Sequence, residues 1–598
     1  MDKRAAPDGS RTAHDTSDAP TARSGPRASA AAPDGSRTAH DTSDAPTARS
    51  GPRASAAAAH VLESIASLLE LKGENPFKVR AFTTAAQLVE GYPGDLAEAL
   101  DSGALAATKG IGPATLEVIR EVALAGRSSM LEALEREVPP GLLEMRRIPG
   151  LGVTKIRTVH ERLGVTTIAE LEAAARDGRL AALPRFGEKT AQKVLRGIAF
   201  VRRASAFRLS HEAAREAEEL RSALAATRGI ARAELAGSVR RRSEVVRDID
   251  LVAVGAAAAA PGEGVDVYCV GAEHFGHAWV RATGSARHWE ALARRAAERG
   301  CRLDETELTR NGAAVPCPDE QTLYTALDLA WIPPELREGG DEIARAANRT
   351  LPVLVERADL RGLVHCHSVY SDGADTLAAL ADACRAAGYQ YLGLTDHSAA
   401  AAYAGGLGEE KVRRQHEEID ALNRGAGGFR ILKGIEADIL ADGSLDYGPA
   451  LLDRFEFVIG SVHSRMEQDG PTMTQRVLRA MDDPHLTVLG HPTGRLLLAR
   501  DPYAIDMHAV IARAAERGVA IEINGDPHRL DLDWRLCAEA RAAGVKIVIG
   551  ADAHSLAGLE NAEWGLGIAR KGGLESGDIL NTLDAEGFLD HARKRKAH

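Results

Sequence analysis

The chain has 598 residues, which is enough for about three to five domains. Its hydrophobic content of 44% suffices for packed cores, and its net charge of −11 excludes a surface that is basic throughout, while leaving room for a local basic patch. The sequence has no signal peptide and no apolar run of about 18 residues, and its six cysteines form no CxxC pair, so we expect a soluble intracellular protein with reduced thiols.

The first part of the chain is a perfect duplication. Residues 5–30 are repeated letter for letter as residues 31–56, and the segment is rich in Ala, Ser, Thr, Pro, Asp and Arg, without large apolar side chains. A segment that buries so little apolar surface does not offset the entropy that folding removes. The composition therefore predicts a disordered tail over residues 1–56.

Apolar residues at helical spacing begin near His60 and predict two helical domains, at 57–138 and 139–205. Each has a G-x-G turn before a helix, and a degenerate third copy lies at 184–198. Such turns expose backbone N–H groups that bind phosphate without reading base sequence. The segment from Arg146 to Arg208 contains fourteen Lys or Arg and only five Asp or Glu. This local excess of positive charge favours a surface that binds the DNA backbone. The turns resemble helix-hairpin-helix elements, and the predicted DNA contacts are Gly110, Gly112, Gly150, Gly152 and Lys155.

Mixed α and β patterning follows, and the stretch DIDLVAV carries the first candidate site. Alternate residues of a strand share one face, so Asp248 and Asp250 point the same way while the apolar residues between them face a core. Asp266, in VDV, shows the same alternation. Aligned carboxylates hold paired Mg²⁺ ions for phosphoryl transfer. A preceding Gly-Ser turn and three arginines, at 240–242, offer N–H, hydroxyl and guanidinium groups to a triphosphate.

The stretch GSVRRRSEVVRDID, after the helix-hairpin-helix segments and before LDLAWIPPELREG, resembles the palm of a family X DNA polymerase. The resemblance implies a nucleotidyltransferase palm at 206–285 and a thumb at 286–340. It implies that the catalytic metal ligands are Asp248, Asp250 and Asp266. The implied nucleotide-binding residues are Gly237, Ser238, Arg241 and Gly284.

This palm departs from the family pattern in several places. Only fifteen residues separate Asp250 from Asp266, so we expect a shortened sheet in which the two aspartate-bearing strands are neighbours joined by a loop of about ten residues. The sugar and base pocket differs from the family at Arg281, Ala282 and Trp289. Val118 stands where some members carry a lyase lysine, so 5′-deoxyribose-phosphate lyase activity is not expected.

After a predicted linker at 341–360, short apolar strands alternate with helices from 361 to about 590, which predicts a parallel α/β barrel. Histidines, aspartates and a glutamate follow the predicted strands. Because the carboxyl ends of barrel strands share one mouth, these side chains should converge and ligate several transition-metal ions. The candidate ligands are His365, His367, Asp372, His397, Glu436, His463, His491, Asp552 and His554.

This ligand set resembles the PHP domain, a phosphoesterase with a distorted (β/α)7 barrel. The resemblance implies one ion held by His365, His367, Glu436 and Asp552. Glu436 is implied to bridge to a second ion held by His463 and His491, and the third ion's ligands are Asp372, His397 and His554. In NGDPHRLDL, the implied contacts to substrate phosphate are His528 and Arg529.

Except for the tail, the chain resembles a bacterial family X DNA polymerase fused to a PHP domain. The resemblance implies template-directed gap filling in DNA repair and a metal-dependent 3′→5′ exonuclease. The implied cofactors are Mg²⁺ or Mn²⁺ in the palm and up to three Mn²⁺ or Zn²⁺ ions in the PHP domain. The implied partners are gapped or primed DNA and dNTPs, for a monomer in the bacterial cytosol that does not bind membrane.

Two alternatives remain open at this point. In the first, the chain is a PHP exonuclease or phosphoesterase whose degenerate polymerase half only binds DNA, which the shortened palm motivates. In the second, it is a small-molecule phosphatase of the histidinol-phosphate type, which explains the histidines but leaves the basic Gly-turn region without a role.

Overall fold

The computed structural model describes residues 52–597, apart from residues 91, 93, 94, 257–261, 263 and 426. Most of the predicted disordered tail lies outside these residues. The end of that tail differs from the prediction, because helix α1 begins at Pro52 rather than after residue 56. Proline suits a first helical turn, and the alanines that follow have the strongest helix propensity. Within the described ranges, no helix is long and apolar enough to cross a membrane.

The amino-terminal helices share one apolar cluster, which includes Leu62 of α1, Ile119 of α5, Ile156 of α8 and Val194 of α10. The cluster spans both helical domains predicted from the sequence. The helices are α1 (Pro52–Lys72), α2 (Pro76–Glu90), α3 (Leu96–Asp101), α4 (Ala104–Ala107), α5 (Pro113–Ala125), α6 (Ser129–Glu137), α7 (Pro140–Met145), α8 (Val153–Leu163), α9 (Ile168–Arg176) and α10 (Gly187–Ala204).

A three-stranded sheet of order β2-β4-β5 lies where the sequence predicts the palm, and its two aspartate-bearing strands are neighbours, as expected. β4 (Ile249–Gly255) is antiparallel to β2 (Ile230–Leu235) and parallel to β5 (Val265–Val270). Ile249 and Leu251 point into the apolar cluster beneath α11 (Ser210–Ala225), as their alternation with the aspartates predicts. The remaining elements are β1 (Arg208–Leu209), α12 (Gly237–Arg240), β3 (Val245–Val246), η1 (Ala272–His274) and α13 (Phe275–Thr283).

The thumb is a small antiparallel sheet with helices around a second apolar cluster. Its elements are α14 (Ala286–Glu298), β6 (Cys301–Leu303), β7 (Leu308–Arg310), β8 (Ala313–Val315), α15 (Glu320–Ala326) and η2 (Pro334–Leu336). The predicted linker at 341–360 needs correction, because it contains α16 (Glu342–Ala347). Ala346 is fully buried in the thumb cluster, and Glu342 Oε1 lies 2.7 Å from His288 Nδ1 of α14.

The carboxyl-terminal region is a closed barrel of seven parallel strands, which confirms the predicted barrel. The strands follow one another in chain order and β15 pairs with β9 to close the ring. They are β9 (Gly362–Cys366), β10 (Tyr391–Leu394), β11 (Arg430–Asp438), β12 (Phe457–Ser461), β13 (Val488–Leu489), β14 (Ala520–Asn524) and β15 (Ile547–Ala553).

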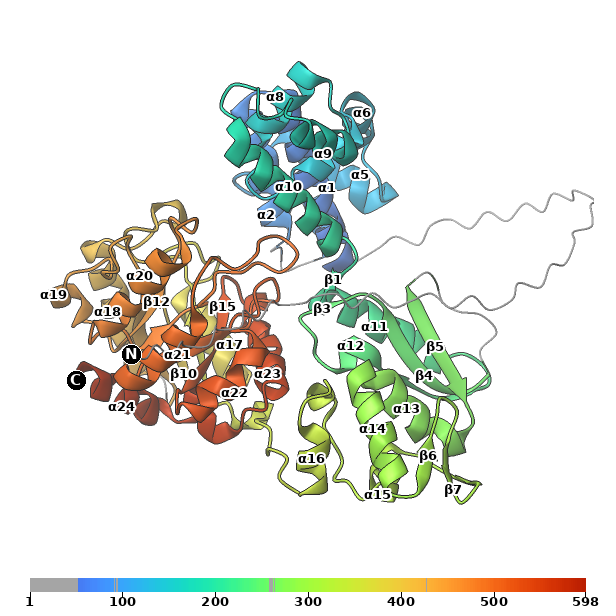
Figure 1. The fold of residues 1–598 in the computed structure, drawn as a ribbon. Helices are drawn as coiled ribbons and strands as arrows, with labels where there is room; N and C mark the ends of the chain where they lie inside the picture. The colour runs from blue at the N-terminus through green and yellow to red at the C-terminus, as the bar shows by residue number, and fades with distance from the viewer. Residues whose placement is uncertain are drawn as a thin grey trace, which may run out of the picture. The chain divides into compact units, whose positions relative to one another are not determined.

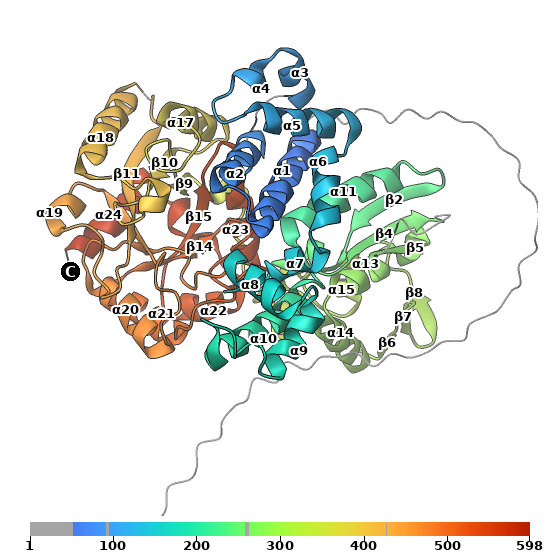
Figure 2. The same ribbon diagram turned by 90° about the horizontal axis from the view of Figure 1, so that it is seen from above.

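Helices surround the barrel strands in both views (Figures 1 and 2). They are α17 (Leu377–Ala386), α18 (Glu409–Arg424), α19 (Pro449–Leu452), α20 (Gly470–Asp482), α21 (Met507–Arg517), α22 (Trp534–Ala542), α23 (Asn561–Lys571) and α24 (Ala585–Lys596). The short 3₁₀ turns are η3 (Arg357–Asp359), η4 (Ala402–Ala404), η5 (Ala557–Glu560), η6 (Ser576–Asp578) and η7 (Leu580–Thr582).

Helix α24 packs against residues near the amino ends of the barrel strands. Phe588 lies 5.8 Å from Tyr391 and 5.3 Å from Phe457 between ring centroids, and all three side chains belong to one buried apolar cluster. The amino end of the barrel is therefore filled with aromatic side chains. Polar side chains are left to gather at the carboxyl ends of the strands.

Candidate active sites

Both predicted helix-hairpin-helix turns have the same backbone conformation. Gly110 and Gly150 adopt left-handed φ values of 107° and 78°, which residues with a Cβ rarely adopt. Gly112 and Gly152 directly precede helices α5 and α8, whose first N–H groups have no partner within the helix. Lys155 lies in the first turn of α8, with Nζ 3.2 Å from the carbonyl of Gly150. Each turn therefore offers phosphate-binding N–H groups, and the second adds a cation.

The three palm aspartates lie on or beside neighbouring strands. Asp250 of β4 stands directly opposite Asp266 of β5, and Asp248 immediately precedes β4. Burial, followed by the charges of Asp248 and Asp266, raises the pKa of Asp250 to about 7. The Tyr268 hydroxyl lies 3.5 Å from Asp250 Oδ1, a contact that sequence reasoning missed. The short connection thus still brings the carboxylates together, and divalent cations would relieve their repulsion.

The palm aspartates are less tightly gathered than the ligands of the barrel. Among the described residues, the groups of three or more whose ligand atoms all lie within 4.8 Å of one another are in the barrel, and the aspartate trio is not one of them. Asp266 is exposed and Asp248 is half-buried.

Gly237 packs directly against the Asp250 carboxylate. Its φ is 61°, and a Cβ at this position would lie 1.9 Å from Asp250 Oδ2, so only glycine lets α12 begin here. The next side chain, Ser238, has a buried hydroxyl with no hydrogen-bond partner in the part of the chain that the structure describes. A buried hydroxyl without a partner is costly, and a nucleotide phosphate oxygen would satisfy it.

Arg240 does not meet the predicted triphosphate site, which corrects the expectation for this arginine. Its guanidinium forms a bidentate salt bridge with Glu320 of α15 and lies 3.6 Å from the ring centroid of Trp279. Arg337, which is fully buried, pairs with the same carboxylate. Glu320 therefore lies between two guanidinium groups, where it stabilises the contact between palm and thumb.

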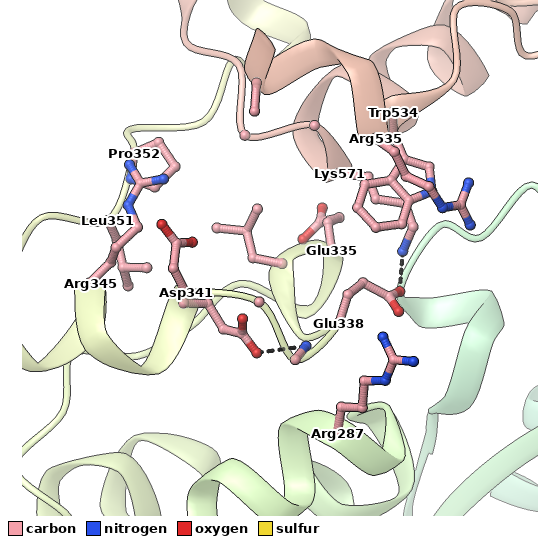
Figure 3. A pocket seen from close by; sticks show the side chains of 17 residues that line it. Arg287, Glu335, Glu338, Asp341, Arg345, Leu351, Pro352, Trp534, Arg535 and Lys571 are labelled. Atoms are coloured by element: carbon pink, nitrogen blue, oxygen red, sulfur yellow. Dashed lines mark hydrogen bonds and ion pairs between the residues drawn. The ribbon is translucent and has the colours of Figure 1, made fainter. Parts of the chain in front are cut away.

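Arg241, the predicted phosphate ligand, is paired with protein groups in this structure. Its Nε donates to Glu338 Oε1 at 2.9 Å, and Nη1 donates to the carbonyl of Thr283, next to Gly284, at 2.7 Å. Lys571 of α23 pairs with the same Glu338 (Figure 3). Its Nζ also donates to the Arg241 carbonyl at 3.2 Å. The pocket of Figure 3 includes Glu338 and Lys571 but none of the predicted site residues. A phosphate that bound Arg241 would therefore have to displace Glu338.

The nine predicted ligands of the barrel lie together at its carboxyl end. His365, Glu436 and Asp552 lie on β9, β11 and β15, and the others lie in the loops that follow β9, β10, β12, β13 and β15. Their ligand atoms form four groups, each within 4.8 Å: His367, Asp372, His397 and His554; His365, Glu436 and His491; His365, His367 and Asp552; and His397, Glu436 and His463.

Glu436 is the centre of the cluster and is almost fully buried. Its Oε1 lies 3.0 Å from His491 Nε2 and 3.3 Å from His463 Nε2, while Oε2 lies 2.9 Å from His397 Nδ1. Asp372 is the corresponding acceptor at the outer side, with its two oxygens each 3.5 Å from a histidine nitrogen. One carboxylate therefore faces histidines from three strand ends, as a bridge between ions requires.

Three of the ligands have strained backbones. His365, His491 and Asp552 adopt positive φ values of 62°, 21° and 50°. Each such residue costs of the order of 1–3 kcal/mol, and it persists only where the surrounding structure determines it. The pairing of β9 with β10 and with β15 is irregular near Cys366, beside His365 and Asp552. The strain is concentrated at the site, as is common where function positions side chains.

The donor set fits divalent metal ions. His365 Nε2, both ring nitrogens of His367, and Glu436 Oε2 are buried without a hydrogen bond among the described residues, since the 2.9 Å approach of Glu436 Oε2 to His397 Nδ1 lacks hydrogen-bond geometry. Buried polar atoms are rarely left in that state, and a bound cation would satisfy all four. Imidazole nitrogens combined with carboxylate oxygens suit ions such as Zn²⁺ and Mn²⁺.

The pKa values of the histidines reflect their burial and the charged groups packed around them. Burial, followed by the neighbouring charge of His554, lowers the pKa of His367 to about 3. Burial also opposes protonation of His397 and His463, but Glu436 and a second carboxylate outweigh it and raise their pKa values to about 10 and about 9. Histidine must be neutral to ligate, so metal binding here displaces protons.

Sequence reasoning missed two buried carboxylates behind the ligands. Glu522 Oε1 lies 2.5 Å from His365 Nδ1, and its Oε2 accepts from the backbone N–H of His491 at 2.6 Å. Asp438 Oδ1 lies 2.8 Å from His463 Nδ1. Each carboxylate fixes the ring so that Nε2 faces the cluster. Strand alternation would have indicated Asp438, which stands two residues after Glu436 on β11.

Asp396 has a different role from the ligand His397 that follows it. Its carboxylate accepts from the hydroxyls of Ser368 and Ser371 and from the Gln415 amide at 2.6 Å, 2.5 Å and 2.6 Å. Its side chain is fully buried. Asp396 therefore holds the loop after β9, which carries Asp372.

The two predicted phosphate contacts lie at different depths. Arg529 Nε is 3.4 Å from Asp552 Oδ2, and only 20% of the arginine side chain is exposed. His528 is more exposed and lies 2.9 Å from Asp526 Oδ1 through its Nδ1. The structure therefore brings Arg529, rather than His528, against the candidate metal centre.

Four known families match parts of the chain. A helix-hairpin-helix domain matches residues 54–128, and a SAM-like helix-hairpin-helix tandem matches 142–199. The DNA polymerase beta thumb matches 278–338, which begins inside the segment that the sequence assigns to the palm. The PHP domain matches 364–526.

Similar proteins fall into two groups. The protein named "DNA polymerase/3′-5′ exonuclease PolX" of Bacillus subtilis is 36% identical over 564 residues, covering 88% of this chain and 98% of that protein. A "Probable phosphatase" of Thermoanaerobacter sp. is 27% identical over 246 residues, covering 39% of this chain and 94% of that protein. One of Clostridium acetobutylicum is 32% identical over 133 residues, which cover 21% of this chain and 52% of that protein. By its near full-length similarity to the first of these, the chain belongs to the PolX family of DNA polymerases with a PHP domain.

Proposed function

We propose that this chain is a template-directed DNA polymerase that fills gaps during DNA repair and trims DNA 3′ ends with a metal-dependent exonuclease centre in its PHP domain. The observation that carries the proposal is the presence of two chemically distinct centres in one chain. The Asp250–Asp266 pair lies beside the Gly237 turn, and nine ligands gather separately at the mouth of the barrel.

In the proposed palm site, Asp248, Asp250 and Asp266 hold Mg²⁺ or Mn²⁺. The bound ions would lower the barrier for attack of the primer 3′-hydroxyl on the incoming nucleotide and neutralise the departing charge. The Ser238 hydroxyl and the N–H groups after Gly237 bind the triphosphate, and Arg241 joins them when it exchanges Glu338 for phosphate. The buried, unpartnered Ser238 hydroxyl supports this role.

In the proposed exonuclease site, the nine barrel ligands hold up to three Mn²⁺ or Zn²⁺ ions in the groups that the resemblance implies. Bound ions would activate water and neutralise the scissile phosphate. Arg529 binds a non-bridging phosphate oxygen beside Asp552, which positions the phosphodiester. Glu522 and Asp438 hold His365 and His463 in the orientation that ligation needs.

Partners and compartment follow from this chemistry. DNA contacts the two G-x-G turns through its backbone, because those turns offer N–H groups without base-reading side chains. dNTPs are the palm substrate. We further propose that the protein is a monomer and acts in the bacterial cytosol, where its DNA substrate is located.

Neither earlier alternative explains the whole chain. A phosphatase of small molecules leaves the helix-hairpin-helix and thumb matches without a role. A remnant that only binds DNA does not need Asp250 opposite Asp266. Nor does it need a glycine at position 237, where an added Cβ would lie 1.9 Å from the Asp250 carboxylate.

A gapped duplex tests the proposal directly. The full chain is incubated with a one-nucleotide-gap substrate labelled on the primer, with and without dNTPs, in Mg²⁺ or Mn²⁺. We expect the primer to lengthen by one nucleotide with the templated dNTP and to shorten from its 3′ end without dNTPs. A primer that shortens but never lengthens would leave only the nuclease alternative, and an unchanged primer in both arms would reject the proposal.

A further inference from the structure

Tyr403 is a large aromatic side chain held in the open beside the barrel centre. It lies on η4, in the loop after β10, and 72% of it is exposed. Its ring centroid is 6.2 Å from that of His397 and 6.4 Å from that of His463, two of the candidate ligands. The metal centre therefore has an aromatic surface at its edge that packs against no core.

The turn that carries Tyr403 is firmly anchored. Ala401, which precedes the turn, and Ala404, which ends it, are buried, so the backbone is anchored while the tyrosine stays exposed. Lys411 Nζ donates to the carbonyl of Gly405 at 2.8 Å, and a Cβ at Gly406 would lie 1.9 Å from the carbonyl of Ser398. An aromatic side chain on a fixed turn loses little conformational freedom on binding.

The Tyr403 side chain is uncharged at neutral pH, because a tyrosine hydroxyl ordinarily loses its proton only near pH ~10. It therefore does not repel a phosphate. A neutral ring is suited to stack against a nucleobase, whatever the base.

Arg529 reaches the same centre from another direction. Tyr403 follows β10, whereas Arg529 follows β14, and these strands are not neighbours in the barrel. If the phosphate of a nucleotide were bound at Arg529 and the ions, its base would extend toward another side of the barrel mouth, where Tyr403 lies. The two residues offer separate contacts to the charged and the aromatic part of one nucleotide.

We propose that Tyr403 stacks against the nucleobase of the 3′-terminal nucleotide and so sets the preference of the exonuclease centre for DNA ends. This inference rests on the proposed exonuclease function. Base–aromatic stacking tolerates any sequence, so the contact favours a nucleotide over a phosphate ester without a base.

The test combines enzyme variants with substrate variants. The full chain with Mn²⁺ degrades a single-stranded oligonucleotide that ends in thymidine, or the same strand ending in a tetrahydrofuran abasic residue. Tyr403→Ala is expected to raise KM about 5- to 100-fold for the thymidine end and to leave KM for the abasic end unchanged. Tyr403→Phe is expected to match the unmodified protein on both strands, because the ring is kept.

Two controls make the outcome specific. Phe77→Ala removes another exposed aromatic, which is 77% exposed on α2, and should change neither KM. Metal content after dialysis should be equal in Tyr403→Ala and the unmodified protein. Degradation by the unmodified protein establishes the exonuclease itself, so a failure of the activity is separate from a failure of the stacking proposal.

Several results would overturn the stacking contact. Equal effects of Tyr403→Ala on KM for the thymidine and abasic ends would show that Tyr403 does not contact the base. An effect that follows the penultimate base would reject the terminal assignment. If Tyr403→Phe raised KM for the thymidine end as much as Tyr403→Ala, the role would belong to the hydroxyl. If Tyr403→Ala lost bound metal, Tyr403 would be part of the metal site.

Discussion

Glu522 Oε1 lies 2.5 Å from Nδ1 of His365, and both side chains are fully buried. The contact fixes the His365 tautomer, so that Nε2 is free to ligate. The same glutamate also accepts from the backbone N–H of His491, a second ligand with a strained backbone. Glu522 therefore supports two ligands from behind without facing the cluster itself.

We expect Glu522→Gln to lower the metal affinity of the PHP domain about 10- to 100-fold, because it keeps the shape but weakens the acceptor for His365. Glu522→Ala should lower it further. The measurement is metal content by mass spectrometry after dialysis against graded Mn²⁺. Glu417→Gln, at an exposed position on α18, is the matched control. Full occupancy in both Glu522 variants would show that the contact is not needed.

The two proposed activities should be separable. Asp250→Ala is expected to abolish nucleotide incorporation on a gapped primer and to leave 3′ degradation intact, because the palm carboxylates and the barrel ligands form different clusters. His365→Ala should have the opposite effect. Both are measured with one labelled primer, with and without dNTPs. If either variant lost both activities while remaining folded, the assignment of separate sites would be wrong.

Gly237→Ala should stop synthesis by displacing the Asp250 carboxylate. The new Cβ would lie 1.9 Å from Asp250 Oδ2, at a φ of 61°. Gly300→Ala is the matched control, since Gly300 has a φ of 68° and its added Cβ would meet no described atom within 4 Å. Both variants should lose about 1 kcal/mol of stability from backbone strain, and only Gly237→Ala should lose primer extension. Equal loss of extension in both would point to strain alone.

The buried Glu320 predicts a pH-dependent stability of the palm and thumb. Burial opposes ionisation, but Arg337 and Arg240 outweigh it and lower the pKa of Glu320 to about 2. A lowered folded-state pKa stabilises the protein above the unfolded pKa of about 4.5, and this stability is lost as pH falls towards 2. The contribution is about 3 kcal/mol, at about 1.4 kcal/mol for each tenfold change in proton affinity.

Glu320→Gln should therefore lower stability at pH 7 and flatten its dependence on pH between about 5 and 2. Urea unfolding, followed by the fluorescence of the tryptophans near Glu320, measures the effect across this range. Glu305→Gln is the control, because its partner contact with Arg281 is at the surface and 81% of its side chain is exposed. The same pH dependence in Glu320→Gln as in the unmodified protein would contradict the prediction.

Lys155 should contribute charge to DNA binding without reading sequence. Lys155→Ala is expected to weaken binding of unrelated duplexes equally and to reduce the slope of log affinity against log salt by about one. Fluorescence anisotropy in EDTA measures binding without degradation. Arg517→Ala removes a positive charge on α21 of the PHP domain, where Arg517 pairs with Asp482, and should leave the slope unchanged. A sequence-dependent loss for Lys155→Ala would contradict backbone contact.

The amino-acid sequence by itself determined the features that depend on neighbours along the chain. Alternation along DIDLVAV placed Asp248 and Asp250 apart from the buried Ile249 and Leu251. Strands followed by histidines or carboxylates specified the barrel and all nine residues at its mouth, because parallel strands in a barrel must end at one side. G-x-G before a helix specified the two matching turns. Each of these needs only local spacing.

Only the tertiary structure decided the contacts between distant residues. Arg240 meets Glu320 across 80 residues of chain rather than a triphosphate, and Glu522 meets His365 across 157. Asp250 lies opposite Asp266 only because the short connection still lets β4 and β5 pair as parallel strands. The burial of a charged residue and the groups that it contacts depend on how the whole chain packs. The identity of the residue alone therefore does not say whether it stabilises the fold, positions a metal ligand or binds substrate.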